Sequence, residues 1–149
     1  MVWGAFSFNG RMNIQFLKGR QTSRDYIELL KKSKIDSEGK RLCGDNWLFQ
    51  QDNAPIHKAK IALDFFKNEN INLLDHPPLS PDLNPIENLW GWMAREVYKN
   101  GSFNTKSELK FAIIKAWASI PESLIRNLIS SMPNRIFELI LKGGSATHY

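Results

Sequence analysis

The sequence predicts an α/β domain, in which a small sheet is followed by a helical tail. Short apolar runs alternate with helix-like segments over the first half of the 149-residue chain. From residue 85 onward, apolar residues recur at three- and four-residue spacing, which is typical of amphipathic helices. The length suits one domain with a buried core, and 42% of the residues are hydrophobic. Strands that alternate with helices favour a sheet flanked by helices.

The chain begins with a predicted β-hairpin. Residues 2–8 and 12–17 are strand candidates, and Asn9-Gly10 lies between them. This dipeptide is typical of two-residue hairpin turns, because both residues tolerate a positive φ angle. We therefore expect two antiparallel strands that turn at Asn9-Gly10.

A helix and a loop are expected after the hairpin. Thr22 or Ser23 can cap a helix that extends to about Lys34, with one apolar side formed by Tyr26, Leu29 and Leu30. Residues 35–45, IDSEGKRLCGD, contain two glycines and many charged side chains, and we interpret them as an exposed loop.

A second pair of strands is predicted around a helix. Residues 46–51 and 71–74 are the strand candidates. The helix between them has apolar residues at three- and four-residue spacing: Ile56, Ala59, Leu63 and Phe66. Residues 76–85, HPPLSPDLNP, contain four prolines and are predicted to be irregular.

The remainder is predicted to be helical. One apolar stripe is formed by Ile86, Leu89, Trp90, Met93 and Val97. A second stripe is formed by Leu109, Ile113, Trp117 and Ile120. Pro121 and Pro133 should divide the tail into shorter helices that end at Gly143-Gly144.

Composition and charge indicate the compartment of the protein and the kind of partner that it binds. The only cysteine is Cys43, and we find no secretory signal and no apolar run long enough to span a membrane, so we expect a soluble intracellular protein. Residues 11–41 carry nine Lys or Arg against four acidic residues, which accounts for the whole net charge of +5. Such a basic zone fits a phosphate backbone as partner, although a solvated helix face with a lysine-rich loop explains it equally well.

Asp52 is the first candidate site residue. It lies in Gln50-Gln51-Asp52-Asn53, directly after the apolar run 47–49. Binding and catalytic groups in α/β sheets lie just beyond the strand ends, where the loops are. The alternative is a purely structural role, in which Asp52 or Asn53 caps the helix that starts near Pro55.

Glu87 is the second candidate, separated from Asp52 by 34 residues. As an alternative to a site role, Asn84 as N-cap, Pro85 at the first helical position and Glu87 at the third resemble a capping box. A carboxylate at a strand end and one at a helix start can also converge on a divalent cation. Mg²⁺ prefers oxygen ligands and is usually held by one or two carboxylates together with waters and phosphates.

The sequences of the motifs around these two acids support the hypothesis of a divalent-cation site. VWGAFSFNG, WLFQQDNAPIH, HPPLSPDLNPIENLW, SMPNRI and the final GG…Y closely resemble, in order, the catalytic domain of mariner-superfamily transposases. These are acidic-triad (DDE) transposases, and the 34-residue gap suits their glutamate-ending branch. The resemblance implies a ribonuclease H-like fold, an α/β mixed sheet flanked by helices with a helical C-terminal tail.

The resemblance also implies roles for individual residues. Asp52 resembles the second catalytic acid of the family and Glu87 the third, and together they imply two bound Mg²⁺ or Mn²⁺ ions, with Asn53 and His57 in supporting positions. The implied reaction is cut-and-paste transposition, in which an endonuclease cuts at terminal inverted repeats and integrates the element at a TA target. The implied partners are double-stranded DNA and a second copy in a homodimer, without membrane or small-molecule cofactor, in the nucleus.

The sequence departs from the family pattern at its start. The first catalytic aspartate of the family lies on the strand before VWGAFS, and an N-terminal helix-turn-helix DNA-binding region precedes it. We therefore expect residues 1–149 to form a single, N-terminally truncated catalytic domain without its first, central strand. The alternative is a catalytically inactive remnant that acts as a DNA-binding or protein-interaction module through its basic zone.

Overall fold

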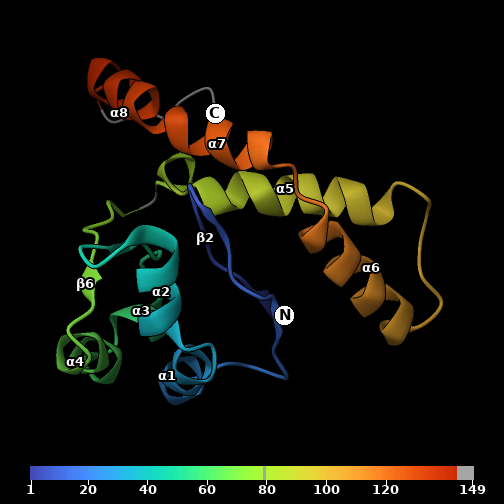
Figure 1. The fold of residues 1–149 in the computed structure, drawn as a ribbon, viewed down its shortest axis with the longest axis horizontal. Coiled ribbons are helices and arrows are strands. Elements are labelled where there is room, and N and C mark those ends of the chain that lie inside the picture. Colours follow the sequence, from blue (N-terminus) through green and yellow to red (C-terminus); the bar gives the residue numbers. More distant parts are fainter. Residues whose placement is uncertain (79, 144–149) are drawn as a thin grey trace. The chain divides into compact units, whose positions relative to one another are not determined.

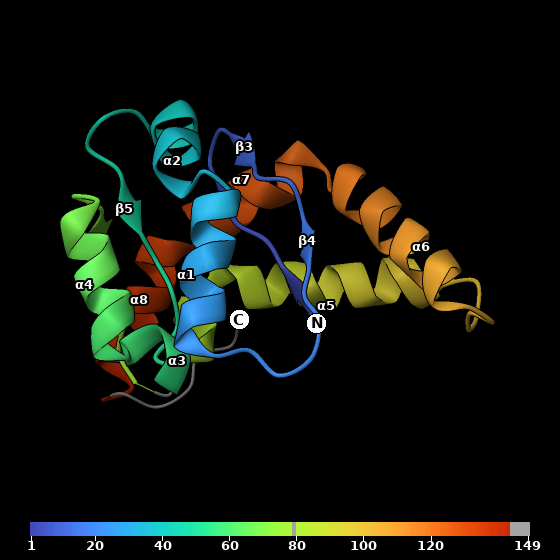
Figure 2. The same cartoon turned by 90° about the horizontal axis from the view of Figure 1, so that it is seen from below.

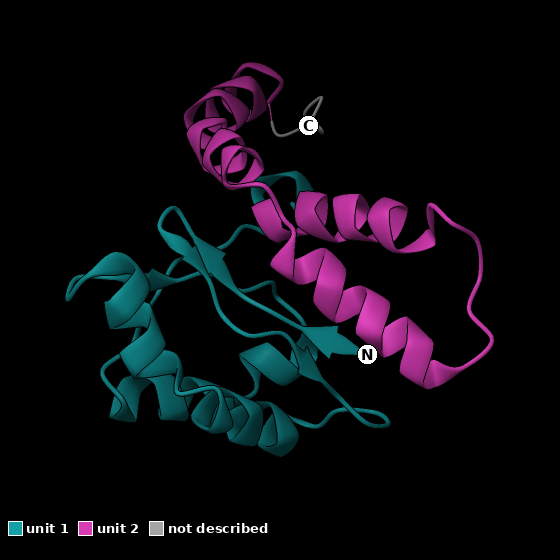
Figure 3. Cartoon of the chain, turned by 45° about the vertical axis from the view of Figure 1, so that its right-hand side comes forward, with its two compact units in different colours: residues 1–84 teal, residues 85–149 magenta. Residues whose placement is uncertain are grey.

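A computed structural model describes residues 1–78 and 80–143 of the chain. The chain divides into two compact units, Met1–Asn84 and Pro85–Tyr149, called here the N-terminal and C-terminal units (Figure 3). The N-terminal unit contains all the described strands together with helices, and the described C-terminal unit is helical. Within the described ranges, no helix combines the length and the apolar character needed to cross a membrane.

The N-terminal hairpin forms, with an irregularity in the middle. β1 (Val2–Trp3) pairs antiparallel with β4 (Gln15–Phe16), and β2 (Phe6–Ser7) pairs antiparallel with β3 (Gly10–Arg11). The pairing leaves two residues between β1 and β2 but three between β3 and β4. One extra residue on the second strand is a β-bulge, which divides the predicted continuous strands into short ladders.

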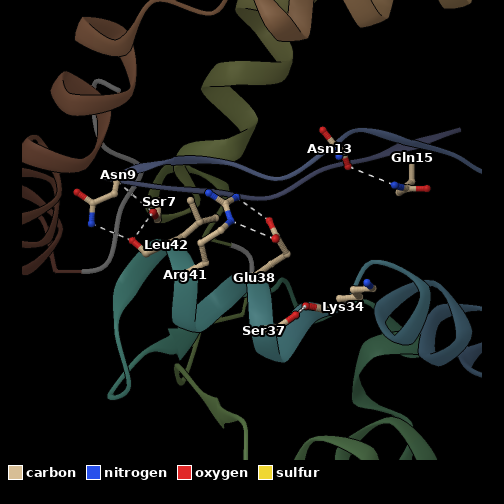
Figure 4. Close-up of polar contacts among 9 residues, drawn as sticks. All are labelled: Ser7, Asn9, Asn13, Gln15, Lys34, Ser37, Glu38, Arg41 and Leu42. Atoms are coloured by element: carbon tan, nitrogen blue, oxygen red, sulfur yellow. Dashed lines mark hydrogen bonds and ion pairs between the residues drawn. The ribbon is translucent and has the colours of Figure 1, made fainter.

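The hairpin turn lies one residue earlier than predicted. Ser7 pairs with Gly10, so Phe8 and Asn9 form the loop and Gly10 belongs to the strand. The backbone N–H of Asn9 donates to Ser7 Oγ over 3.2 Å, and the Asn9 side chain donates to the Leu42 carbonyl over 2.8 Å (Figure 4). The side chain of Asn9 therefore anchors the turn to a neighbouring helix end, whose last carbonyls lack intrahelical donors.

The first helix agrees with the prediction. α1 (Ser23–Lys32) begins after Thr22, whose side chain accepts from the Asp25 N–H while the Asp25 carboxylate accepts from the Thr22 N–H. This reciprocal capping box satisfies two N–H groups that the helix itself cannot satisfy. The predicted residues Tyr26, Leu29 and Leu30 are its buried side.

The predicted loop at residues 35–45 is wrong, because most of it is a helix. α2 (Ile35–Cys43) buries Ile35, Gly39 and Leu42, and the intervening positions are mainly charged. A Cβ atom on Gly39 would overlap the indole ring of Trp47. Gly39 therefore serves close packing rather than a turn, and this close approach is a tertiary contact that the local sequence does not reveal.

The second strand pair is parallel. β5 (Leu48–Phe49) pairs with β6 (Asn72–Leu73), inside both predicted ranges. Antiparallel and parallel pairs flanked by helices confirm the α/β prediction. Among the described residues, no ladder joins the hairpin to the β5–β6 pair.

The helix expected between these strands is divided in two. α3 (Pro55–Lys58) and α4 (Lys60–Asn68) meet at Ala59, whose ψ of 139° is extended rather than helical. This break rotates the second half, so Ala62, Phe65 and Phe66 are buried and the expected stripe residue Leu63 is exposed. α1 and α4 pack side by side (Figures 1 and 2).

These elements enclose one apolar cluster in the N-terminal unit. Its buried members come from the hairpin, α1, α2, α4, β5 and the residues directly before β5 and β6: Met12, Tyr26, Leu29, Leu30, Ile35, Leu42, Trp47, Phe49, Ala62, Phe65, Phe66 and Ile71. The ring of Phe49 stacks on that of Phe66 with the centroids 5.5 Å apart. β5 is therefore anchored in the core immediately before the polar residues that follow it.

The C-terminal unit contains α5 (Pro85–Tyr98), α6 (Lys106–Ala118), α7 (Glu122–Ser130) and α8 (Met132–Leu141). Leu89, Met93 and Val97 of the first predicted stripe are buried. Trp90 of that stripe stacks on Trp117 of the second, with the centroids 5.6 Å apart. Pro121 precedes α7 and Pro133 lies in the first turn of α8, as predicted, whereas Gly144 lies outside the described residues.

Candidate functional site

The polar residues after β5 are fixed by hydrogen bonds to the proline-rich segment, to α1 and to the start of α3. Gln50 and Asn53 bind the proline-rich segment. The Gln50 side chain donates to the Leu83 carbonyl over 2.7 Å and lies 3.2 Å from His76 Nδ1, and Asn53 donates to the His76 carbonyl over 2.7 Å. In this segment, which the sequence predicts to be irregular, Pro81–Leu83 forms a short 3₁₀ helix, η1, and the carbonyls that so short a helix leaves without donors need side-chain partners. The two side-chain amides therefore hold His76 and Leu83 against the strand end.

Gln51 points to α1. Its side-chain carbonyl accepts a hydrogen bond of 2.5 Å from the hydroxyl of Tyr26, which is buried in the core. Burial, and to a smaller extent the negative charge of Asp52, raises the pKa of the Tyr26 phenol well above its usual range. Tyr26 therefore acts as a neutral hydrogen-bond donor that joins α1 to the strand end.

Asp52 is the one acid in this stretch, and its two carboxylate oxygens differ. Oδ1 accepts hydrogen bonds from the Ala54 N–H over 3.0 Å and from His57 Nδ1 over 2.6 Å. Oδ2 accepts none from the described part of the chain. The Asp52 side chain is 51% exposed. One oxygen is thus fixed by two donors, and the other is open to solvent or to a ligand.

The structure supports only part of the alternative, in which Asp52 has a purely structural role in the turn before α3. The bond to the Ala54 N–H is the short-range contact expected of aspartate in a turn. However, Ala54 is the N-cap of α3, and no side chain caps that helix. Capping of α3 therefore does not explain Asp52 or Asn53.

Glu87 lies in the first turn of α5, at the third helical position that the sequence predicts. Its side chain is exposed and forms no hydrogen bond or ion pair with another described residue. The backbone N–H of Asn84, which a capping box would join to Glu87, donates to the Pro81 carbonyl over 2.9 Å. The capping box that was the alternative for Glu87 is therefore not formed among the described residues, and the Glu87 carboxylate is available to another partner.

The residue after Glu87 takes part in a buried polar contact that sequence reasoning missed. Asn88 Oδ1 accepts from Arg135 Nη1 over 2.9 Å, and Arg135 Nε donates to Ser131 Oγ over 2.9 Å. Arg135 is only 2% exposed, so its charge depends on such partners. The available signal was the motif SMPNRI, which places an arginine on a helix made mostly of apolar residues.

The basic zone is partly neutralised by the chain itself. Lys31, Lys40 and Arg41 form ion pairs with Glu28, Asp36 and Glu38, and the last of these is visible in Figure 4. The cations that form no ion pair with another described residue are Lys18, Arg20, Arg24, Lys32 and Lys34. The surplus of positive charge therefore lies mainly around the two ends of α1.

The two candidate acids belong to different units, Asp52 to the N-terminal unit and Glu87 to the C-terminal unit. Within the described ranges, no group of three or more His, Cys, Asp or Glu residues could by itself hold a metal ion. The donor chemistry of each acid nevertheless fits a hard cation, because each presents a carboxylate oxygen that has no partner among the described residues.

Comparisons with known proteins agree on one family. The model of a family described as "DDE superfamily endonuclease" matches residues 1–110. Tc3 transposase of Caenorhabditis elegans is 42% identical over the whole chain, and Tcb1 transposase of Caenorhabditis briggsae is 35% identical. The chain covers 45% and 54% of these relatives, so it spans about half of their length.

The fold has solved counterparts. The Mos1 transposase catalytic domain, determined with raltegravir and manganese, matches with a TM-score of 0.86 and 19% identity, over 99% of this chain and 76% of that chain. A Mos1 paired-end complex with the left transposon end gives the same TM-score at 22% identity, over 97% of this chain and 44% of that chain. This likeness confirms the predicted ribonuclease H-like fold class.

Proposed function

This chain belongs to the family of DDE superfamily endonucleases, and we propose that it supplies two of the catalytic acids, Asp52 and Glu87, with which a mariner-type transposase cuts and joins DNA. The observation that carries the proposal is the hydrogen bonding of the two carboxylate oxygens of Asp52. Its carboxylate lies at the end of an anchored strand, with one oxygen held by two donors and the other without a partner among the described residues. The fixed oxygen sets the direction of the carboxylate, and the open oxygen can accept a hard cation.

Glu87 is the second acid. Its carboxylate lies in the first turn of α5 without a capping bond, and the hydrogen bond from Gln50 to Leu83 anchors the chain only four residues before it. A shared site for the two acids is supported by the family match, which extends over residues 1–110 and so includes both Asp52 and Glu87.

The two carboxylates would hold Mg²⁺ or Mn²⁺. When bound, these cations activate the attacking oxygen and stabilise the departing oxygen of a phosphodiester. The residues of the chain supply the negative charge that holds the cations and the rigid placement of that charge. Asn53 contributes to the placement by holding the proline-rich segment, and His57 by holding Asp52.

The substrate in this proposal is double-stranded DNA. The reaction is cut-and-paste transposition, with cleavage at the inverted repeats, strand transfer to a TA target and the nucleus as the place of action. Mos1 transposase has been solved as a paired-end complex with the left transposon end, which supports transposon-end DNA as a partner and a pair of subunits as the active form. The cations near α1 that form no ion pair with another described residue, such as Lys18, Arg20 and Lys32, suit contacts with phosphates.

The test is DNA cleavage by a chimera in which this chain replaces the matching part of Tc3 transposase. We expect nicking at Tc3 element ends in Mg²⁺, and its loss in both Asp52→Asn and Glu87→Gln. Glu122→Gln is the matched control, since Glu122 is also an exposed glutamate in a first helical turn of the C-terminal unit.

The outcomes separate the active and inactive interpretations. Nicking that survives Asp52→Asn or Glu87→Gln would refute the assignment of these acids. A folded chimera that binds element ends without nicking them would instead support the inactive, DNA-binding remnant. Loss of nicking in Glu122→Gln as well would mean that the assay reports folding rather than chemistry.

A further inference from the structure

The side chain of His57 is largely buried and packed against another ring, although the residue lies in a surface helix of four residues. Its side chain is only 18% exposed, although the neighbouring residue Lys58 is exposed. The imidazole ring packs on the ring of Tyr26, with the centroids 4.3 Å apart and the planes at 41°. Tyr26 is itself fixed by the core and by its hydrogen bond to Gln51. The ring of His57 therefore has little freedom to rotate.

This fixed ring points one nitrogen at Asp52. The distance from His57 Nδ1 to Asp52 Oδ1 is 2.6 Å, and because a carboxylate can only accept, Nδ1 carries the proton and donates. The Ala54 N–H donates to the same oxygen. Both donors thus act on Oδ1, and the rotation of the carboxylate about its Cβ–Cγ bond is restrained while Oδ2 stays unbonded among the described residues.

We propose that His57 is a positioning residue, which fixes Oδ1 of Asp52 so that Oδ2 is presented to the divalent cation. This inference rests on the proposed function, because it concerns the same cation. Nδ1 of His57 cannot bind a cation in this arrangement, since it carries the proton that it donates to Asp52. Partners that orient a ligating carboxylate typically change metal affinity 10- to 100-fold when they are removed.

Three substitutions at one position separate orientation from packing. His57→Ala removes the donor. His57→Asn keeps it, because the asparagine Nδ2 is bonded to Cγ as Nδ1 is in histidine. His57→Gln places its amide nitrogen one bond further out, where it matches Nε2 instead. We expect Mn²⁺ affinity of this chain to fall about 10- to 100-fold in His57→Ala and His57→Gln, and to be largely restored in His57→Asn.

A second readout needs no cation. A long-range ¹H–¹⁵N NMR spectrum of His57 should show the proton on Nδ1 in the parent chain, because the acceptor decides which nitrogen is protonated. Asp52→Ala should abolish this preference. Thermal melting without Mn²⁺ should give similar midpoints for His57→Asn and His57→Gln, so that their different affinities reflect orientation rather than stability.

The results distinguish this inference from the proposed function. Mn²⁺ affinity that is unchanged in His57→Ala, or equal in His57→Asn and His57→Gln, would overturn the positioning role and leave the cation site intact. An Nδ1 proton signal that is indifferent to Asp52→Ala would also overturn it. Mn²⁺ that binds to no form of the chain would overturn the cation site itself, and the positioning role with it.

Discussion

Gly39 offers a sharp test of the packing described for the N-terminal unit. It lies in the middle of α2, where alanine is ordinarily more favourable than glycine by about 1 kcal/mol. At this position, however, an added Cβ would lie 2.5 Å from Cδ2 of Trp47 and closer still to Cε2 and Cζ2. Carbon atoms in contact prefer separations of about 3.5–4.0 Å, so the indole or α2 must move by about 1 Å or more.

The expected change in the free energy of unfolding is the cost of overpacking minus the gain in helix propensity. Trp47 is buried and its ring also contacts Phe49, so the movement disturbs the core. Overpacking of this kind costs about 1–3 kcal/mol, and the rigid ring places the cost in the upper half of that range. After the helical gain of about 1 kcal/mol, we expect Gly39→Ala to lower the free energy of unfolding by about 1–2 kcal/mol. For a chain of this length the melting midpoint should fall by about 2–8 °C.

The assay is thermal unfolding followed by far-ultraviolet circular dichroism. Gly91→Ala is the matched control, because Gly91 also lies inside a helix but its added Cβ would meet only Arg95 Nη1, at an ordinary 3.8 Å. The control should be neutral or stabilising by up to about 1 kcal/mol. Trp47→Leu should remove most of the cost of Gly39→Ala in a double-mutant cycle. A Gly39→Ala chain as stable as the parent would refute the close approach of α2 and Trp47.

Three further predictions concern stability. Thr22→Ala removes the side-chain acceptor of the α1 capping box and should cost about 1 kcal/mol, measured by chemical denaturation. The hydrogen bond from Thr22 lowers the pKa of Asp25, and that from Arg41 lowers the pKa of Glu38, so folding favours both ionised carboxylates. Their contribution should be complete above the unfolded pKa of about 4 and decline as the pH falls below it, with a smaller decline in Asp25→Asn. Burial and the charge of Asp52 raise the pKa of Tyr26, so folding favours its protonated form. Stability should therefore fall as the pH rises above about 10, where the tyrosine of the unfolded chain ionises, and an unfolding series on Tyr26→Phe that showed the same fall would contradict this cause.

The sequence predicted those elements whose signals are local. The helix cap at Thr22 or Ser23, the buried side of α1 and the stripe through Leu89 and Met93 all depend on residues within a few positions of each other. The errors arose where distant contacts decide the outcome. Gly39 was interpreted as a loop residue because only the distant ring of Trp47 explains it, and the extended backbone at Ala59 has no proline or glycine to mark it.

The same contrast between local signals and distant contacts applies to the residues of the candidate site. Asp52 and Glu87 are predicted from their positions at a strand end and a helix start and from the motifs that contain them, and His57 is predicted as a supporting residue, because these signals are contiguous in the sequence. The role of Tyr26 was not predicted, since its hydrogen bond to Gln51 joins residues 25 positions apart. Arg135 was also missed, because its contact with Asn88 joins two motifs that are 47 positions apart.

The central claim is that Asp52 and Glu87 hold the same divalent cations. The most direct measurement is the rise in melting midpoint of this chain with Mn²⁺ for the parent, Asp52→Asn, Glu87→Gln and the double variant. Asp64→Asn, which changes another exposed acid of the N-terminal unit, is the control. A ligand at about 100 times its dissociation constant adds roughly 2.7 kcal/mol, so the parent midpoint should rise by several degrees. We predict that either single substitution removes most of this rise and that the double variant loses no more. A rise that both single variants retain, or two independent losses that add, would contradict a shared site.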